Sequence, residues 1–295
     1  MGLIALMVSA VNKFPASGSA IVGQVLGMGL VSSLVLLPVA MGIVASYFWR
    51  SLDLSKAKIA GCSLITALVS LGGAYFFWGE GTVCLVIGGP ILFLLLFTGS
   101  LLGEGFFYRS PNRLNVFVLP LAIVLALADG ALPSNKQGVV TDRIVIAAAP
   151  TEVWKHVVAF PRITAEPDYW LNKVGLPSAA ETTCEGEFVG AKRECIFSNG
   201  LVFKEVVAEL EPQRRLTFDI VEQPSDPELL GHVTLHRGQF QLEANGDGTT
   251  TLIGRSWYTL HVRPFWYFDW WTRDITREVH LRVMNHIKQL SEHRG

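Results

Sequence analysis

The sequence predicts an α+β globular domain preceded by an all-α membrane region of four transmembrane helices. Two observations predict this division. Long apolar stretches fill residues 1–131, whereas short strand-like segments separated by turns, and then one long amphipathic helix, fill the rest. The charges follow the same boundary, because only six of the 24 lysines and arginines and four of the 25 acidic residues precede residue 130.

The overall composition agrees with a membrane protein. Only 17% of the residues are charged and 50% are hydrophobic, with a mean hydropathy of +0.38. A soluble domain carries about a quarter charged residues. The formal net charge is −1, which provides no basic footprint for a polyanion, so no nucleic-acid partner is expected.

The membrane region is predicted to span residues 1–131 and to contain four helices. Each apolar stretch is close to or above the roughly 20 residues that a bilayer requires. The expected helices occupy residues 21–49, 59–78, 82–102 and 114–132. The apolar segment Met1–Val11 is too short to span and is expected to lie at the interface or on the bundle.

Basic residues in the loops predict the orientation. Arg50, Lys56 and Lys58 follow the first span, and Arg109 and Arg113 precede the fourth. By the positive-inside rule both loops are cytoplasmic, so an integral plasma-membrane (inner-membrane) protein with its globular domain on the non-cytoplasmic, periplasmic side is expected.

The spans themselves offer little chemistry. None carries an ionisable residue at its middle, so they show no transport or proton pathway. Two small-residue motifs, Gly23-x-x-x-Gly27 and Gly99-x-x-x-Gly103, allow close helix approach. They could serve packing within the bundle or contact with another membrane protein.

The globular domain is expected at residues 139–295, after a polar linker at 132–138. Pro150 and Glu152 mark the start of a helix that ends near Ala159. A short helical piece is expected at 168–173. Strands are expected at 139–147, 188–197, 201–209, 215–221, 239–244 and 250–262. Short turns such as Asn199-Gly200 join several of them, which predicts an antiparallel sheet.

The last helix, from Arg263 to His293, carries one apolar stripe. Its members recur every three or four residues: Trp271, Ile275, Val279, Val283, Ile287 and Leu290. A helix of this kind must pack its apolar stripe against another layer of secondary structure. We therefore expect it to cover one face of the sheet.

Two strings resemble a known superfamily. The residues are Ile146–Trp154 (IAAAPTEVW) and Gly190–Phe197 (GAKRECIF), supported by Asn199-Gly200 and the run Val206–Leu216. Residues 139–290 resemble the polyketide cyclase/dehydrase-like branch of the START-like (SRPBCC, helix-grip) superfamily. The resemblance implies an antiparallel sheet wrapped around the long C-terminal helix, with an apolar cavity between them. Relatives bind lipids, sterols, polyketides or other hydrophobic ligands, and some are cyclases or hydrolases. The superfamily shares no catalytic motif, so it assigns no catalytic residue and no cofactor.

The last strand has two faces that the sequence does not distinguish. One carries Leu252, Gly254, Ser256, Tyr258 and Leu260. We favour the other, the Trp257 face, because its aromatic and polar mixture suits a ligand pocket. In the alternative, Trp257 is core and Arg255 and His261 lie at the rim. The cavity candidates are Cys195, Phe197, Ile253, Arg255, Trp257, His261, Val279, His280 and Val283.

Cysteine and histidine give weak chemical signals. Cys195 could be a nucleophile beside a histidine, but a buried inert thiol is the preferred interpretation. His280 is best explained as a hydrogen-bonded core histidine. His280 and His286 lie on different sides of the helix and cannot share a metal, so no metal site is expected. A bridge between Cys184 and Cys195 would need the intervening chain to fold back.

Aromatic residues cluster where the last helix begins. Phe265, Trp266, Tyr267 and Trp270 are candidates for contact with the membrane interface, where Trp and Tyr are enriched. The alternative is a dry contact between sheet, helix and loop. Membrane lipid, a hydrophobic small molecule and another membrane protein are the expected partners.

Three functions remain open. The first is a membrane-anchored binding module for a lipid or polyketide-like molecule, which needs an apolar cavity of several hundred Å³. The second is a cyclase, dehydratase or hydrolase, which needs an acid/base pair inside that cavity. The third is an accessory subunit of a larger membrane complex, in which side chains fill the interior.

Overall fold

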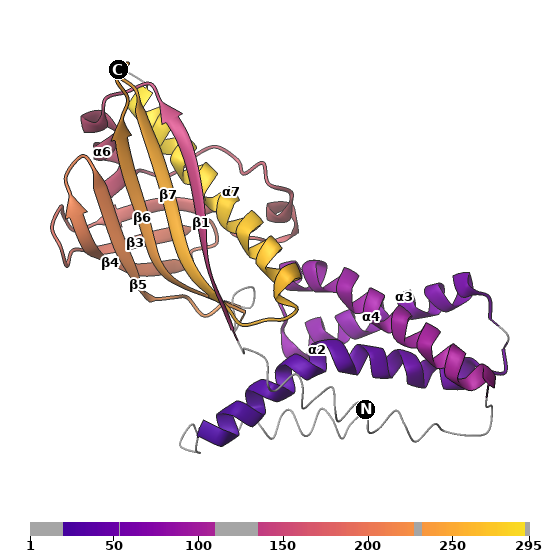
Figure 1. The fold of residues 1–295 in the computed structure, drawn as a ribbon. Helices are drawn as coiled ribbons and strands as arrows, with labels where there is room; N and C mark the ends of the chain where they lie inside the picture. The colour runs from indigo at the N-terminus through magenta and orange to yellow at the C-terminus, as the bar shows by residue number, and fades with distance from the viewer. Residues whose placement is uncertain (1–19, 53, 110–134, 227–231, 293–295) are drawn as a thin grey trace. The chain divides into compact units, whose positions relative to one another are not determined.

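The computed structural model describes residues 20–52, 54–109, 135–226 and 232–292. Contacts divide the chain into two compact units, Met1–Trp78 with Val86–Ser134, and Gly79–Leu85 with Asn135–Gly295. Figure 1 shows the elements of both units. The first is helical, and the second contains one sheet with its helices.

The helical unit contains α2 (Ala20–Trp49), α3 (Lys56–Gly73), the π-helical turn η1 (Ala74–Trp78) and α4 (Thr82–Arg109). They lie where the first three spans are predicted. In the described part of the chain, two stretches are long and apolar enough to cross a bilayer, Lys56–Phe77 and Thr82–Phe107, and Val35–Trp49 is a shorter apolar helix. The predicted fourth span at 114–132 and the segment Met1–Val11 lie outside the described residues. A four-helix bundle is therefore not shown.

Glycines bring α2 and α4 together. A Cβ atom added to Gly42 would lie 2.2 Å from the carbonyl oxygen of Leu96, and one added to Gly99 would lie 2.1 Å from that of Val39. At Gly103 the added atom would meet Ser46 Oγ at 1.9 Å. Any larger residue would push the backbones apart, so the Gly99-x-x-x-Gly103 motif serves packing within this chain.

The second unit is built on one antiparallel sheet of seven strands, in the order β1-β7-β6-β5-β4-β3-β2. The strands are β1 (Lys136–Ile146), β2 (Ala179–Cys184), β3 (Lys192–Phe197), β4 (Val202–Glu211), β5 (Arg215–Glu222), β6 (Val233–Ala244) and β7 (Thr250–Leu260). The helices are α6 (Pro150–Val158), the 3₁₀ turn η2 (Trp170–Val174) and α7 (Phe265–Glu292).

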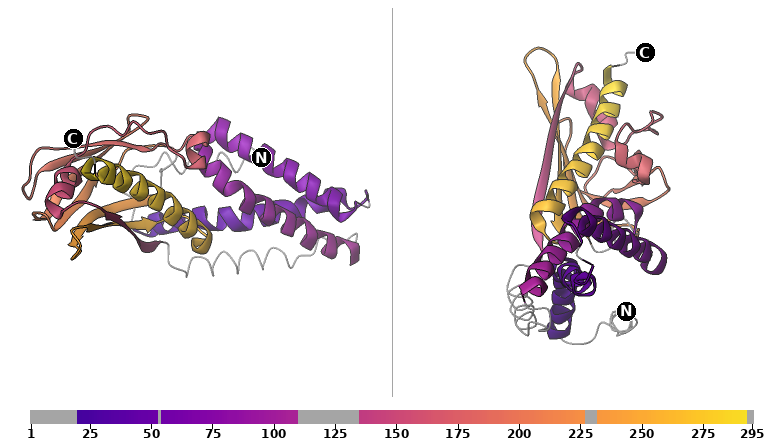
Figure 2. Two further views of the ribbon diagram at one scale, coloured as in Figure 1. Left: turned by 90° about the horizontal axis from the view of Figure 1, so that it is seen from above. Right: turned by 90° about the vertical axis from the view of Figure 1, so that its right-hand side faces the viewer.

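The sheet curls around α7. This helix contacts β1 and β2, which are the two edge strands, as well as β7 inside the sheet. One helix can reach both edges only if the sheet bends toward it, and the left view of Figure 2 shows strands on both sides of α7. The expected antiparallel sheet wrapped around the terminal helix is confirmed.

The core lies between the sheet and the helices α6 and α7. Val283, Met284 and Ile287 of α7 are buried in it, and Val279 and Leu290 pack at its margin. These residues include most of the predicted apolar stripe. Trp154 and Val157 of α6 close the same core.

Asp269 ties the beginning of α7 to the sheet. It accepts hydrogen bonds from Tyr258 at 2.6 Å, Lys136 at 2.9 Å and Arg273 at 2.9 Å. Burial alone would raise the pKa of this carboxyl, but the three donors together hold its pKa below the ordinary value of 3.8. Since Lys136 begins β1 and Tyr258 lies on β7, one carboxylate fixes the helix to both strands.

Several boundaries differ from the prediction. β1 begins at Lys136, inside the expected linker, because it pairs with β7 along its full length from Leu260 to Thr250. β2 was not predicted, since its sequence Ala-Ala-Glu-Thr-Thr-Cys has no apolar alternation. β3 begins at Lys192 rather than residue 188, and β6 extends back to Val233.

Candidate functional site

A cavity of about 100 Å³ lies between the curled sheet and α7. Most of its wall is apolar. Five phenylalanines from four strands and the loop after α6 line it: Phe160, Phe197, Phe203, Phe218 and Phe240. Val279 and Val283 contribute from the helix. The hollow is smaller than the several hundred Å³ expected from the sequence, because these rings fill much of the space beneath the helix.

A buried ion pair forms one polar part of the wall. Arg193 on β3 and Glu205 on β4 are cross-strand partners, and Arg193 Nη1 donates a hydrogen bond to Glu205 Oε2. Arg193 Nε also donates to the carbonyl oxygen of Val158 at 3.2 Å, and the guanidinium lies 4.3 Å from the centre of the Phe218 ring. Burial raises the pKa of Glu205, and the neighbouring Arg193 opposes that rise. Both side chains are almost wholly inaccessible.

Two smaller polar groups lie beside this pair. Thr182 and Cys195 face each other across the β2–β3 ladder, and both line the cavity. Burial, followed by the negative charge of Glu205, raises the pKa of Cys195 to about 12. The thiol is therefore neutral at physiological pH. The Thr182 hydroxyl is buried beside the Cys195 thiol, its cross-strand neighbour.

On the opposite side of the cavity three residues form a hydrogen-bonded chain. Ser256 Oγ lies 2.8 Å from His280 Nε2, and His280 Nδ1 lies 2.8 Å from Asp142 Oδ2. An ionised carboxylate only accepts hydrogen bonds, so Asp142 receives the proton on Nδ1. In the neutral imidazole, Nε2 then accepts the hydroxyl proton of Ser256. Arg277 Nε lies 3.7 Å from the second carboxylate oxygen of Asp142.

The sheet register places these groups together. Asp142 pairs with Gly254, and Val140 with Ser256, so Asp142 and Ser256 are diagonal neighbours on one face of β1 and β7. His280 contacts both side chains from α7 and is 8% exposed. A Cβ atom at Gly254 would lie 3.0 Å from Met284 Sδ and 3.8 Å from His280 Cγ. Glycine here lets the helix approach closely enough for both hydrogen bonds.

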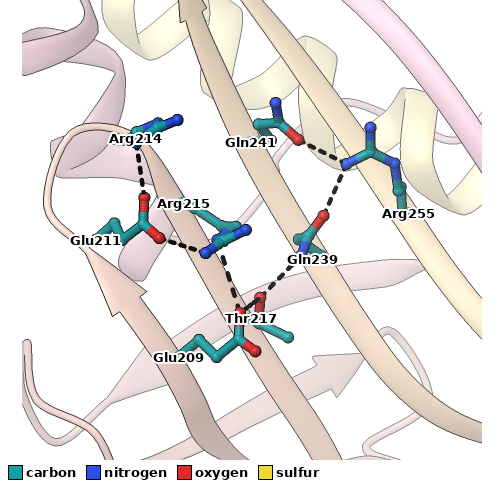
Figure 3. Close-up of polar contacts among 8 residues, drawn as sticks. All are labelled: Glu209, Glu211, Arg214, Arg215, Thr217, Gln239, Gln241 and Arg255. Carbon is teal, nitrogen blue, oxygen red and sulfur yellow. Dashed lines mark hydrogen bonds and ion pairs between the residues drawn. The ribbon is translucent and has the colours of Figure 1, made fainter.

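The other face of β7 carries a separate polar network, drawn in Figure 3. Arg255 Nη1 donates to Gln239 Oε1 at 2.7 Å and to Gln241 Oε1 at 2.8 Å. Gln239 in turn donates to Thr217 Oγ1 at 3.0 Å. Leu216, Phe218, Phe240 and Leu252, which alternate with these residues, belong to the core. The network therefore covers the face of the sheet that points away from α7.

This arrangement corrects the preference for the Trp257 face. The face that meets α7 carries Gly254, Ser256 and Tyr258. Alternation in a strand defines two sets of residues but does not say which set a distant helix covers. Ile253 is buried on the outer face, and His261 Nε2 lies 3.0 Å from Thr234 Oγ1 there.

Six of the nine cavity candidates line the hollow: Cys195, Phe197, Arg255, Val279, His280 and Val283. The side chain of Arg255 is nevertheless engaged in the outer network. Ile253, Trp257 and His261 do not line the cavity. Contact of any of these residues with a ligand stays a prediction.

Five polar residues of the site are not among the residues predicted from the sequence: Asp142, Thr182, Arg193, Glu205 and Ser256. One signal was available for the ion pair. The Asn199-Gly200 turn fixes the register of β3 against β4, which pairs Arg193 with Glu205. Asp142 and His280 are 138 positions apart, so no local pattern connects them.

The aromatic residues at the beginning of α7 divide into two groups. Trp266 and Trp270 are 73% and 58% exposed. Phe265 packs against a small cluster that includes Val140, Tyr258 and Leu260, and Tyr267 is half-buried. Contact with a bilayer stays a prediction.

None of the four cysteines forms a disulfide in the described part of the chain. No group of three or more metal-binding side chains occurs in the part of the chain that the structure covers.

Among known proteins, only solved structures are similar to this chain in the comparisons made. No family model and no curated protein matches the chain. Among solved structures, a truncated norcoclaurine synthase from Thalictrum flavum is similar over 56% of this chain and 99% of its own, with 14% identity and a TM-score of 0.39. A protein from Nitrosospira multiformis is similar over 52% of this chain and 94% of its own (17% identity, TM-score 0.36), and one from Mesorhizobium loti over 54% and 99% (16%, 0.35). Likeness at these scores says nothing about a ligand or a reaction, so the function has to be inferred from the cavity itself.

Proposed function

We propose that the globular unit binds a small, mainly apolar molecule in the cavity between its sheet and α7. One observation carries this proposal: a hollow lined by five phenylalanine rings also holds a few polar side chains, among them Thr182, Ser256 and His280. Apolar walls with a small number of polar groups are typical of sites for small molecules. A ligand with one hydrogen-bonding group would bond to these side chains while its apolar part contacts the rings.

The volume limits the ligand. Drug-sized ligands occupy sites of roughly 300–1,000 Å³, and a dry cavity of about 150 Å³ is enough for benzene. At about 100 Å³, the hollow suits a molecule no larger than a small ring or a short chain unless side chains move. A sterol or a complete lipid would not fit the space present.

The interior also bears on the third hypothesis. An accessory subunit without a ligand would be expected to fill its interior with side chains. The hollow favours a binding role over a purely structural one. The hydrogen-bonded Ser256, His280 and Asp142 favour the enzyme hypothesis.

We also propose that the protein is anchored in the inner membrane with this unit on the periplasmic side, as the basic loops suggest. Trp266 and Trp270 would then contact the headgroup region. Their exposure supports this, because large exposed apolar side chains usually mark an interaction surface when they cluster.

The binding proposal can be tested by filling the cavity. Val279 and Leu290 are both partly buried on α7 and both pack against the same core, but only Val279 lines the hollow. Val279→Phe should abolish binding of 4-fluorophenol to the full chain in detergent, measured by fluorine NMR. Leu290→Phe is the matched control and should bind as the parent does.

Equal binding by the parent and both variants would refute the proposal, since probe partitioning into detergent is common to all three samples. Native mass spectrometry of the protein from its own membrane is an independent check. A small molecule bound at unit stoichiometry is expected in the parent and not in Val279→Phe.

A further inference from the structure

We infer that Ser256 is a nucleophile, activated by His280 and Asp142, and that the cavity is the site of an acyl-transfer reaction that hydrolyses small esters. The inference rests on the proposed binding of a small apolar molecule in that cavity. It adds a reaction and a substrate class to that proposal.

The direction of the hydrogen bonds suits a nucleophilic serine. Asp142 holds the proton of His280 on Nδ1, and this leaves Nε2 free to accept the proton of Ser256 at 2.8 Å. A serine hydroxyl is a weak nucleophile until such a base removes its proton. The order hydroxyl, imidazole, carboxylate with two bonds of 2.8 Å meets the geometric requirement of a serine triad.

A molecule in the cavity has access to the serine and the histidine. Ser256 and His280 both line the cavity, so a molecule bound there would contact both side chains. Asp142 touches only the imidazole among these groups and is therefore a positioning residue. Its other oxygen lies 3.7 Å from Arg277 Nε.

His280 differs from two other histidines of the same unit. Two other imidazoles in the same unit contact a threonine hydroxyl, at 2.7 Å for His236 with Thr259 and 3.0 Å for His261 with Thr234. Among the described residues, neither has a carboxylate at hydrogen-bond distance. His280 differs in having the carboxylate and in facing the cavity.

A side chain must donate the hydrogen bond to the carbonyl oxygen of the ester substrate. Ser256 lies on an inner strand, paired with Val140 on one side and Gly238 on the other, so its backbone groups belong to the ladder. Side-chain donors that line the same cavity include the Thr182 hydroxyl and the Arg193 guanidinium. They would hold the oxygen on which negative charge develops.

The reaction then balances with water as the second substrate. Ser256 Oγ bonds to the ester carbonyl carbon and its proton passes to His280 Nε2. The bond between that carbon and the alcohol oxygen breaks, and the alcohol takes the proton from His280. Water attacks the acyl-serine, gives its proton to His280, and releases the carboxylic acid as the proton returns to Ser256.

The experiment uses methanesulfonyl fluoride, which is small enough for the cavity. Attack by Ser256 forms an oxygen–sulfur bond and breaks the sulfur–fluorine bond, and hydrogen fluoride leaves. Incubation of the full chain in detergent should give one methanesulfonyl adduct, located on Ser256 by peptide mass spectrometry. The parent should also release acetate from phenyl acetate.

Variants make the test specific. Ser256→Ala should give no adduct, and Asp142→Asn should slow the modification at least a hundredfold while thermal unfolding shows that each remains folded. Thr259→Ala and Thr234→Ala, which alter the other two hydroxyl–imidazole pairs, should be modified at the parental rate.

An adduct on another residue, or one whose rate is unchanged in Asp142→Asn, would overturn the inference. Absence of any adduct in a parent that still binds 4-fluorophenol would overturn the reaction and leave the binding proposal standing. Loss of both would refute both.

Discussion

Glu205→Ala should strongly destabilise the globular unit, because it leaves the Arg193 guanidinium buried without its counter-ion. Arg193 and Glu205 are 3% and 4% exposed. Removal of one partner of such a pair costs about 3–5 kcal/mol. For a domain of this size about 1 kcal/mol lowers the unfolding temperature by about 2–4 °C, so a fall of about 6–20 °C is expected.

The neighbouring residue provides the matched control. Lys204 pairs with Glu222 at 2.9 Å, but the two side chains are 51% and 62% exposed. An exposed pair is screened by solvent and contributes little to stability. Lys204→Ala should therefore lower the unfolding temperature far less than Glu205→Ala does, although it lies on the same strand as Glu205.

The assay is thermal unfolding of the full chain in detergent, followed by near-ultraviolet circular dichroism of the tryptophans. Replacement of both charges, as Arg193→Met with Glu205→Leu, should recover at least half of the lost stability, since no unpaired charge then remains buried. The carbonyl of Val158 loses a donor in that variant, so full recovery is not expected. Equal effects of Glu205→Ala and Lys204→Ala would refute the reasoning.

Three further predictions concern other parts of the unit. Asp269→Asn should lower the unfolding temperature at neutral pH. Because the folded-state pKa of Asp269 is lowered, the stability that this carboxylate contributes is present above its ordinary pKa of 3.8 and is lost as the pH falls further. The difference in unfolding temperature between the parent and the variant should therefore shrink in acid. Cys195, whose pKa is raised from 9.0 to about 12, should react with iodoacetamide at pH 8 at least a hundredfold more slowly than free cysteine, as measured by peptide mass spectrometry; comparable rates would contradict its burial. For residues 135–295 produced alone and shown to fold, the double substitution Trp266→Ser with Trp270→Ser should weaken liposome binding. The control pair, Phe188→Ser with Val189→Ser, removes exposed apolar side chains elsewhere and should leave liposome binding unchanged. Equal effects of the two pairs would contradict a bilayer contact.

Local patterns in the sequence determined the order of elements. The Asn199-Gly200 turn predicted the β3–β4 hairpin, and Gly200 adopts the positive φ of 85° that the turn requires. The apolar stripe of α7 predicted which of its residues enter the core. These features depend on neighbours within a few positions, so periodicity and turn chemistry are sufficient to identify them.

The tertiary structure alone decided which face of β7 meets α7 and how large the cavity is. Gly254 and Ser256 gave no stronger signal than Arg255 and Trp257, because a strand alternates between two faces that are equivalent until another layer covers one. The volume depends on how five phenylalanine rings from separate elements pack, which no single segment specifies.

Local patterns in the sequence specify an apolar helical region followed by an antiparallel sheet and its long covering helix. Only the tertiary structure brought Asp142, Ser256 and His280 together. The order of helices and strands arises from spacings of two to four residues along the chain. The meeting of these three side chains depends on long-range strand pairing and helix packing, which place residues 138 positions apart at hydrogen-bond distance.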